Sequence, residues 1–325
     1  MTKSKVYTVK KLTEPQRLDL FLSLAMKTTR SQVQKYIDHG CVLVNGVPAK
    51  KTGVMVEHGD KIEYVADEVV VEKKKKALSF PEISIIAETK DYLVIEKPAG
   101  ILVHPTEAGE QNTLAQWLLK KYPKMKNVGD TPGRPGIVHR LDKDASGLLV
   151  IAKNQKQFLA LKQQFKDRTI DKEYTVLVYG VLKNNQVKLD FPIARGEQGR
   201  MAARPVIGEF RLRHAGVTLD GKDAHSELFV EKKFGRFTLL RVKIYTGRTH
   251  QIRVHCFAYG HPVVGDTIYV NKRMVKKGDQ KIDRLFLHAR KLSFDTLSGE
   301  RMTFESQLPE ELQTYLANLS VNTYL

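Results

Sequence analysis

HRLDKDASGLLVIAK, residues 139–153, joins a cluster of charged side chains directly to an apolar run. One histidine, one arginine, one lysine and two aspartates fall within its first six residues. Charges beside a core strand are costly to desolvate unless they are paired or used. If residues 138–142 are extended, Arg140 and Asp142 project to one face and Leu141 to the other. The stretch predicts a buried strand preceded by a carboxylate that is ion-paired or functional.

Two interpretations of Asp142 follow from the residues alone. It either forms a structural ion pair with Arg140 or serves as an ionised carboxylate in a site. A carboxylate repels phosphate, so a protein that binds nucleic acid tolerates it in a site only with a role. Tyr174, farther along, is likewise either a half-buried sheet tyrosine or a site residue.

The composition describes a basic globular protein. Of its 325 residues, 54 are Lys or Arg and 36 are Asp or Glu, giving a formal charge of +18. This excess implies a polyanionic partner, either nucleic acid or an anionic membrane. Apolar runs such as LLVIA are too short to span a bilayer, and the N-terminal MTKSKVYTVKK has no apolar signal region. We expect a cytoplasmic, nucleic-acid-binding protein without a membrane partner.

Several catalytic chemistries lack their sequence signatures. There is no GxGxxG, GxxxxGK[ST], HExxH or CxxC pattern, so the usual phosphate loops and metal motifs are absent. His250 and His255 are five residues apart, which does not place two ligands on one helix face. We therefore expect no metal site. Cys41 and Cys256 are expected to be buried, small apolar residues without a disulfide.

Residues 16–66 have the pattern of a small separate module. RLDLFLSLAM has apolar residues at helical spacing, and TTRSQVQKYIDHG (28–40) predicts a second helix capped by Thr29 or Ser31. CVLVNGVPAKK (41–51) contains an Asn-Gly turn between two strand-like segments. This is a strong hairpin signal.

Basic and polar side chains gather on the second helix and the hairpin of this module. They are Arg30, Gln32, Lys35, Lys50 and Lys51. A helix–hairpin surface of this kind suits contact with a phosphate backbone. The alternative is a solvated face with no partner. We expect the module to bind RNA or DNA.

The rest of the chain is expected to form one larger domain, 83–325, after a linker at 67–82. The linker DEVVVEKKKKALSFPE has a charge block typical of exposed, mobile chain. The expected helices in the domain are 113–122 and 155–167, and the expected strands are 84–89, 92–97, 147–153, 172–180, 237–247 and 291–297. No βα unit repeats, so the sequence predicts an α+β fold rather than a doubly wound sheet.

Residues 245–266, YTGRTHQIRVHCFAYGHPVVGD, supply further candidate site residues. These are Arg248, His250, Gln251 and Arg253. In an extended register Gln251 and Arg253 share a face, and the intervening isoleucine takes the opposite one. Both arginines could also be plain phosphate contacts.

Taken together, the motifs resemble those of the RluA-type pseudouridine synthases. HRLDKDASGLLVIAK is similar to the signature of that family, KEYTVLVYG to its tyrosine motif, and TGRTHQIRVHCFAYGHPVVGD to its third motif. DYLVIEKPAGILVHP and LFLHARKLSF resemble the first and last strands of the same domain. The module at 16–66 is similar to the S4 RNA-binding domain that often precedes it. The resemblance covers nearly the whole chain after its first dozen residues.

The resemblance implies an α+β catalytic domain with a mainly antiparallel sheet, which isomerises uridine to pseudouridine in RNA without a cofactor or metal. The catalytic aspartate maps to Asp142. Arg253 maps to the cationic partner that keeps it ionised. Tyr174 maps to the residue that stacks on the target base and is a candidate for proton transfer. Arg140 maps to the arginine that helps displace the nucleotide from its stack, a step that costs a few kcal/mol.

Members with the N-terminal module usually act on large-subunit ribosomal RNA, which is the expected substrate, and we expect a monomer. The alternatives are the same reaction on transfer RNA, a non-catalytic ribosome-assembly factor, and an RNA glycosidase or hydrolase. A glycosidase would need a second carboxylate opposite Asp142, and Asp144 does not oppose it. Two positions depart from the family pattern. Ala145 replaces the usual threonine or serine, and Val270 stands where glycine is common.

Overall fold

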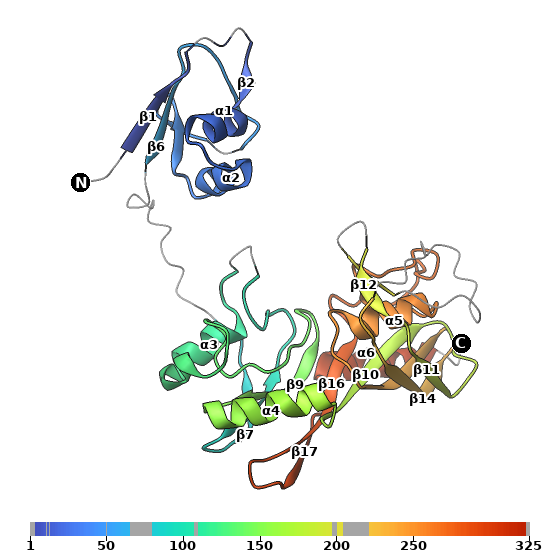
Figure 1. Ribbon diagram of the computed structural model, residues 1–325. Helices are drawn as coiled ribbons and strands as arrows, with labels where there is room; N and C mark the ends of the chain where they lie inside the picture. The colour runs from blue at the N-terminus through green and yellow to red at the C-terminus, as the bar shows by residue number, and fades with distance from the viewer. Residues whose placement is uncertain are drawn as a thin grey trace. The chain divides into compact units, whose positions relative to one another are not determined.

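The computed structural model describes residues 4–10, 12, 14–49, 51–65, 80–106, 110–196, 200–203 and 221–322. The chain forms two compact units, Met1–Ser79 and Phe80–Leu325 (Figure 1). The linker predicted at 67–82 lies outside the described residues except for its last three. None of the described helices is long and apolar enough to cross a membrane.

A four-stranded sheet and two short helices make up the N-terminal unit. The antiparallel strands run in the order β1 (Ser4–Thr8), β6 (Lys61–Val65), β3 (Val42–Val44) and β4 (Val47–Pro48). The helices are α1 (Leu18–Ala25) and α2 (Arg30–Asp38), and β2 (Gln16–Arg17) pairs with β5 (Met55–Val56). Leu22, Val33 and Ile62 bring the helices and the sheet together in one core. The predicted order of two helices and a hairpin is confirmed.

Local side-chain chemistry explains the boundaries of these elements. The Thr29 hydroxyl accepts a hydrogen bond from the Gln32 backbone N–H, which caps α2 as predicted. Asn45 and Gly46 have φ angles of 51° and 79°, the left-handed conformation that a two-residue hairpin turn needs.

A large mixed sheet forms the frame of the C-terminal unit. Its strands are, in spatial order, β11 (Gln186–Leu189), β14 (Ser226–Phe234), β15 (Phe237–Ile244), β10 (Asp171–Tyr179), β16 (Leu287–Asp295), β9 (Ser146–Ala152), β8 (Tyr92–Lys97) and β7 (Ser84–Glu88), with β17 (Arg301–Glu305) paired to β16. All of these pairings are antiparallel except β9 with β16. A separate ribbon pairs β12 (Ile193–Arg195) with β13 (Met201–Ala203). The α+β fold with a mainly antiparallel sheet is confirmed.

Helices occur irregularly along this unit rather than after each strand. They are α3 (Leu114–Lys121), the 3-10 turn η1 (Pro123–Asn127), α4 (Gln155–Asp167), α5 (Gln251–Ala258) and α6 (Glu310–Asn322). All seven residues of β9 are buried, because α4 packs against it and strands flank it. Phe158 and Leu161 supply the apolar face of α4 at the spacing that the sequence predicted.

The parallel pairing of β9 with β16 depends on one glycine. Gly147 has a φ of 115°, and a Cβ atom there would lie 2.3 Å from the carbonyl oxygen of Ala289. No other residue fits so close a backbone approach. The strand that follows the charged stretch is therefore fixed in the centre of the sheet.

Residues 138–142 are not part of a strand, but Leu141 is buried, with 4% of its surface exposed, while Arg140 is exposed, so the two side chains differ in burial as the extended register predicts. One local prediction was wrong. Residues 251–258 form helix α5 instead of an extended segment. The first six residues of α5 are all buried, so its sequence has no amphipathic period to reveal a helix. Cys256, within it, and Cys41 are both buried, as predicted.

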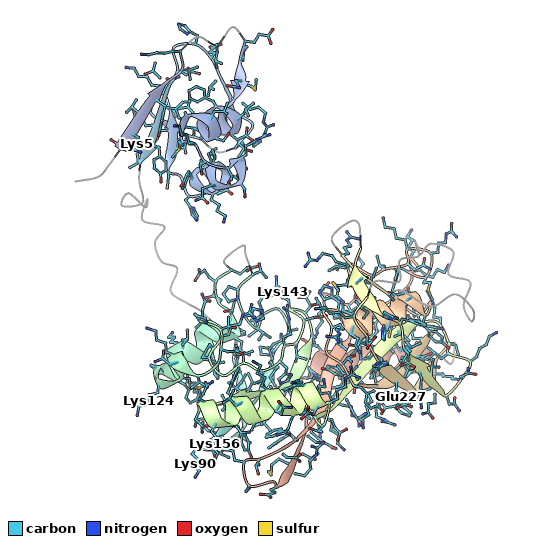
Figure 2. The ribbon with its side chains drawn as sticks, viewed as in Figure 1. Lys5, Lys90, Lys124, Lys143, Lys156 and Glu227 are labelled. Atoms are coloured by element: carbon cyan, nitrogen blue, oxygen red, sulfur yellow. The ribbon has the colours of Figure 1, made fainter. Side chains whose placement is uncertain are left out.

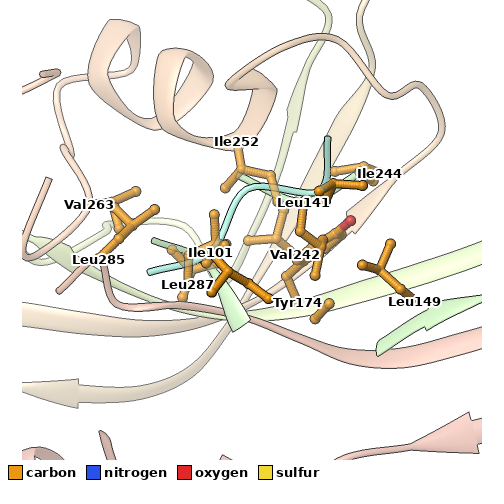
Figure 3. Close-up of a cluster of buried hydrophobic side chains, with 14 of the residues drawn as sticks. Ile101, Leu141, Leu149, Tyr174, Val242, Ile244, Ile252, Val263, Leu285 and Leu287 are labelled. Atoms are coloured by element: carbon orange, nitrogen blue, oxygen red, sulfur yellow. The ribbon is translucent and has the colours of Figure 1, made fainter. Parts of the chain in front are cut away.

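The apolar core reaches the face of the sheet beneath α5. Figure 3 shows Ile252 of α5 pointing toward the sheet, near Leu141 and Tyr174. The loop 139–145, the start of α5 and strand β10 therefore share one packed cluster. This packing fixes the polar side chains that the same segments carry.

Candidate active site

A buried arginine joins two aspartates at the start of α5. Arg253 Nη1 donates to Asp142 Oδ2 at 3.1 Å. Its Nε and Nη2 donate to the two carboxylate oxygens of Asp266 at 2.6 and 2.8 Å. Arg253 and Asp266 are 6% and 7% exposed. Burial acts to lower the pKa of Arg253, but the bonds and charges of the two aspartates raise it above its usual value.

Asp266 orients the guanidinium and is itself fixed by the backbone. Its Oδ1 also accepts hydrogen bonds from the N–H groups of Ile268 and Tyr269 at 2.8 and 2.9 Å. A Cβ atom at the preceding Gly265 would lie 1.9 Å from the Arg284 carbonyl oxygen. The sequence analysis missed Asp266. Its position at the end of the third motif, directly after a glycine, was the available signal.

Asp142 opens into a cavity of about 410 Å³ between loop 139–145, β10 and the start of α5. The structure brings all four predicted catalytic residues to this cavity: Arg140, Asp142, Tyr174 and Arg253. Tyr174 lies on β10 and is 6% exposed. Burial, followed by the negative charge of Asp142, raises the pKa of Tyr174 well above its usual value. The phenol is therefore neutral.

His250 is the second polar neighbour of Asp142. Its backbone is left-handed, with a φ of 56°, at the N-cap of α5. Its Nε2 lies 4.0 Å from Asp142 Oδ1, and its Nδ1 is 3.0 Å from the Tyr269 hydroxyl oxygen. Burial lowers the pKa of His250, with an opposing contribution from Asp142. His250, predicted as an RNA contact, lines the cavity close to the carboxylate.

Gln251 was predicted to contact RNA, which requires an accessible side chain, but the residue is buried. It is 3% exposed. Its Oε1 accepts from the Thr246 hydroxyl and the Arg248 N–H, and its Nε2 donates to the His225 carbonyl and the Ser226 hydroxyl. These bonds use the amide fully and hold the loop before α5. We therefore assign Gln251 to positioning this loop rather than to contact with RNA.

Lys97 holds in place the loop that carries Asp142. Its ammonium is fully buried and donates to the carbonyl oxygens of Pro98, Ile101 and Lys143 at 2.7, 3.0 and 3.0 Å. Burial and the charge of Arg284 lower the pKa of Lys97 to about 7. Lys143, whose carbonyl group is held in this way, follows Asp142 directly and is labelled in Figure 2. A lysine at the end of the mostly apolar strand YLVIEK was a signal that the sequence analysis did not use.

The rim of the cavity is basic. Arg134 and Arg140 are exposed and line it, and Arg248 lies half-buried beside them. Arg248 Nε donates to the Asp223 carbonyl at 2.9 Å. Arg140 makes no ion pair with Asp142 among the described contacts, because Asp142 is bound by Arg253. Ala145 is 1% exposed and packs in the core at the edge of the cavity.

In the N-terminal unit the predicted RNA contacts divide into three groups. Arg30 Nη2 lies 2.7 Å from Asp19 Oδ2, and Arg17 Nε lies 3.0 Å from Asp19 Oδ1. Lys35 and Lys51 are exposed and Gln32 is half-buried. Lys50 lies outside the described residues. The sequence analysis did not identify Arg17 or its link to Arg30 through Asp19.

The sequence of this chain matches two known protein families. Residues 91–258 match the model of the RNA pseudouridylate synthase family, and residues 16–62 match the S4 domain. The first of these ranges contains the predicted catalytic residues and the cavity loops, and the second contains both N-terminal helices.

Relatives extend the match over almost the whole chain. The protein named Uncharacterized RNA pseudouridine synthase YlyB of Bacillus subtilis (strain 168) is 34% identical over 94% of this chain and 95% of its own length. The Ribosomal large subunit pseudouridine synthase D of Nitrosomonas europaea is 35% identical over 92% of this chain and 83% of its own.

A solved structure supports the fold of the C-terminal unit. Human RNA Pseudouridylate Synthase Domain Containing 1 superposes with a TM-score of 0.55 at 26% identity, over 70% of this chain and 84% of that one. The signature stretch, the α+β fold and the matches over more than nine-tenths of the chain agree. This chain therefore belongs to the RNA pseudouridine synthase family and carries an S4 domain in its N-terminal unit.

Proposed function

We propose that this enzyme converts uridine to pseudouridine in large-subunit ribosomal RNA, with Asp142 as the catalytic carboxylate. The observation that carries the proposal is the arginine between two aspartates. Arg253 holds Asp142 at the wall of a cavity, and Asp266 fixes Arg253. The ribosomal substrate is supported by the name of the Nitrosomonas europaea relative and by the S4 domain. Such a substrate would place the reaction in the cytoplasm.

Asp142 is arranged to act as a nucleophile. Its Oδ2 is bound by Arg253 and its side chain is 14% exposed, so Oδ1 remains available to a substrate in the cavity. The attack is either on C1′ of the ribose or on C6 of uracil. In both cases a bond to an Asp142 oxygen forms, the glycosidic bond to N1 breaks, the base turns, C5 bonds to C1′, and the bond to Asp142 breaks again to release the carboxylate. The proton on C5 leaves and N1 gains one, so no cofactor is required.

Tyr174 is assigned to contact with the target base. Its ring lies in the cavity wall, and its phenol is neutral. A neutral ring on a rigid strand offers a stacking surface, worth about 1–3 kcal/mol per base. This repays part of the few kcal/mol that extrusion of the nucleotide costs. Of the two roles predicted for Tyr174, stacking fits this environment better than proton transfer does.

The arginines at the rim, of which Arg134 and Arg140 are exposed and Arg248 is half-buried, are suited to the rest of the nucleotide. We assign Arg140 to displacing the target nucleotide, and Arg134 and Arg248 to its phosphates. Their positions around an Asp142-containing cavity support this division, since phosphate contacts fix a nucleic acid but do not select a base.

In the S4 domain, the proposed RNA contacts are the exposed basic groups of α2 and the hairpin. Lys35 and Lys51 are exposed, and the Arg30 side chain remains 55% exposed although it pairs with Asp19. Arg17, 49% exposed and bound to the same aspartate, joins this set. These groups supply affinity that depends on salt concentration.

The test is release of tritium from RNA transcribed with 5-tritiated uridine. Formation of pseudouridine expels the hydrogen of C5, so wild type should release tritium from large-subunit ribosomal RNA. Asp142→Asn should release none while binding the RNA with nearly unchanged affinity, since the change removes only the charge. Release from transfer RNA alone would mean that the substrate is transfer RNA and not ribosomal RNA. Equal release by both proteins would mean that the reaction does not need the Asp142 carboxylate. No release from any RNA would favour a non-catalytic assembly factor.

A further inference from the structure

Lys172 lies on the wall of the catalytic cavity and has no role in the mechanism so far. It stands two residues before Tyr174 on β10, so the two side chains share one face of the strand. Both line the cavity that contains Asp142. Lys172 is 9% exposed, so most of its side chain is buried.

The ammonium group of Lys172 is without a counter-ion in the described part of the chain. Its recorded contact is with the Phe165 ring of α4, whose centroid is 5.3 Å from Nζ. The buried Lys97, by comparison, donates to three carbonyl oxygens. Burial alone lowers the pKa of Lys172, to about 8, and no acidic group opposes this effect. A cation buried in this way is costly unless an acceptor reaches it.

The isolation of Lys172 does not result from a lack of acidic residues nearby. Asp171 and Glu173 flank it in sequence but pair with basic groups of β15, Lys243 at 2.8 Å and Arg241 at 3.4 Å. Strand alternation places these acids on the opposite face from Lys172. On the face toward the cavity, Lys172 therefore carries a positive charge that is paired with no acidic side chain of the described residues.

Depth in the cavity indicates which part of a nucleotide would reach Lys172. The phosphates of an extruded nucleotide stay with the RNA backbone, where the exposed Arg134 and Arg140 line the rim. The base enters farthest. The mostly buried Lys172, two residues from Tyr174 on the same strand and in the same cavity wall, would therefore meet the uracil ring, whose acceptors are the two carbonyl oxygens.

The reaction puts negative charge on these oxygens. If Asp142 attacks C1′, the electron pair of the C1′–N1 bond leaves with N1 and is shared with both carbonyl oxygens. If Asp142 attacks C6, the pair of the C5–C6 double bond moves toward C5 and the C4 carbonyl oxygen. Either route gains from a fixed cation at the carbonyl, because such a group acts most strongly where charge develops.

We propose that Lys172 donates a hydrogen bond to a carbonyl oxygen of the extruded uracil and stabilises the negative charge that forms on the base. This inference rests on the proposed function, since it needs the uracil to bind in the Asp142 cavity. It assigns Lys172 as a catalytic residue of the isomerisation, together with Asp142, Tyr174 and Arg253.

The charge state of Lys172 can be tested by varying the pH, once the groups that surround it are taken into account. His139 lines the cavity beside it; burial and the charge of Lys172 lower the pKa of His139 to about 3, so this ring is neutral. The His139 Nε2 accepts from the Val150 N–H. Phe165 of α4 and Leu292, its partner on β16, are apolar. The other titratable side chains that line the cavity are His104, Asp142, Tyr174, Tyr245 and His250, together with the guanidinium groups of Arg134, Arg140, Arg248 and Arg253. His250 adjoins Asp142.

The experiment compares Lys172→Met and Lys172→Arg with wild type in single-turnover tritium release from ribosomal RNA. Methionine keeps an apolar stem but removes the charge, and we expect the rate to fall on the order of 100-fold while the RNA Kd changes less than about threefold. Lys172→Arg should retain within about tenfold of the wild-type rate. Lys156→Met is the matched control, because Lys156 is exposed on α4 and outside the cavity (Figure 2).

A pH profile separates this role from simple packing. The ammonium is the active form, so the wild-type rate should fall as pH rises through the Lys172 pKa of about 8. Lys172→Arg should lose this decline, since guanidinium keeps its charge. A Lys172→Met rate within about twofold of wild type would overturn the proposal. If the Met variant fails to fold, identical pH profiles of wild type and Lys172→Arg would overturn it. A wild type that releases no tritium would instead contradict the proposed function.

Discussion

Each of the two units contains an ion-pair network of aspartate and arginine side chains, but the numbers of the two residue types are reversed. In the N-terminal unit, one aspartate binds two arginines: Asp19, with a side chain 7% exposed, holds Arg17 and Arg30, which are about half exposed. In the catalytic unit, one arginine binds two aspartates: Arg253, with a side chain 8% exposed, holds Asp142 and Asp266. The first network has a surplus positive charge, and the second a surplus negative charge.

The sign and exposure of the surplus charge indicate the role of each network. Exposed guanidinium groups that share one carboxylate still attract phosphate, and water screens them. A buried network cannot rely on water, so its members depend on one another. The surplus carboxylate, Asp142, is the member that opens into the cavity. The networks should therefore respond differently to mutation, the buried one through turnover and the exposed one through affinity.

The largest effect is expected from removing the shared arginine of the buried network. Arg253→Met should lower turnover about 1000-fold, because it leaves Asp142 without its cation and Asp266 as an unpaired buried charge. Arg253→Lys keeps the charge but cannot make all three hydrogen bonds, so we expect an intermediate loss. Tritium release at saturating RNA measures both. An unimpaired Arg253→Lys would show that only the charge is needed and not the geometry.

A smaller effect should follow from weakening the outer member of the same network. Asp266→Asn keeps the shape but removes the charge that fixes the guanidinium, and we expect a loss of turnover of about 10- to 100-fold. The RNA Kd should stay within about twofold, since Asp266 does not line the cavity. Filter binding and tritium release on the same preparation separate the two quantities. A loss of affinity without loss of rate would contradict the assignment of Asp266 to positioning.

The exposed network should change affinity instead. The double change Arg17→Gln and Arg30→Gln should weaken RNA binding and reduce the slope of log K against log salt by about 2, one unit for each phosphate contact. Single-turnover rates at saturating RNA should not change. Lys5→Gln, in β1 of the same unit, is the control for a general loss of charge (Figure 2). An unchanged salt slope would mean that these arginines do not contact RNA.

The smallest expected effect is a loss of stability of the N-terminal unit at acidic pH. The hydrogen bond from Arg17, reinforced by Arg30, lowers the pKa of Asp19 to about 2. A carboxyl group with a lowered pKa stabilises the fold above its unfolded pKa and loses this contribution as pH falls toward the folded value. Stability should therefore fall by about 1 kcal/mol between roughly pH 4 and pH 2, after discounting for screening by water.

Amide hydrogen exchange of α1 and α2 in the full chain measures this change within the N-terminal unit. Asp19→Asn should remove the acid dependence and give the lower stability at neutral pH as well. The same exchange slope in both proteins would show that another group is responsible.

Much of the architecture was predictable because local signals agreed with the final structure. The cap at Thr29, the Asn45-Gly46 turn and the apolar run of β9 each act within a few residues. Helix α5 was not predictable from periodicity, because its first six residues are all buried. Strand β11 has only four residues, and it pairs with β14, which is distant in sequence.

For the site, the sequence by itself determined which chemical groups were available. The motifs singled out Arg140, Asp142, Tyr174 and Arg253, and each of them lines the cavity. Whether these residues act as assigned stays a prediction that the experiments above test. Composition and local patterns likewise predicted a basic helix–hairpin module ahead of a larger α+β domain, and the resemblance of their motifs to known families identified the two as an S4 domain and a pseudouridine synthase domain.

Only the tertiary structure decided which of these groups meet. Asp142 and Arg253 are 111 residues apart, and Arg253 is shared with Asp266 rather than offered to phosphate. Gln251 became internal, and Lys172 lies in the cavity wall against the Phe165 ring, with no acidic counter-ion among the described residues. The physical reason is that burial and charge pairing are set by contacts between distant segments, whereas local sequence sets only turns, caps and the faces of strands.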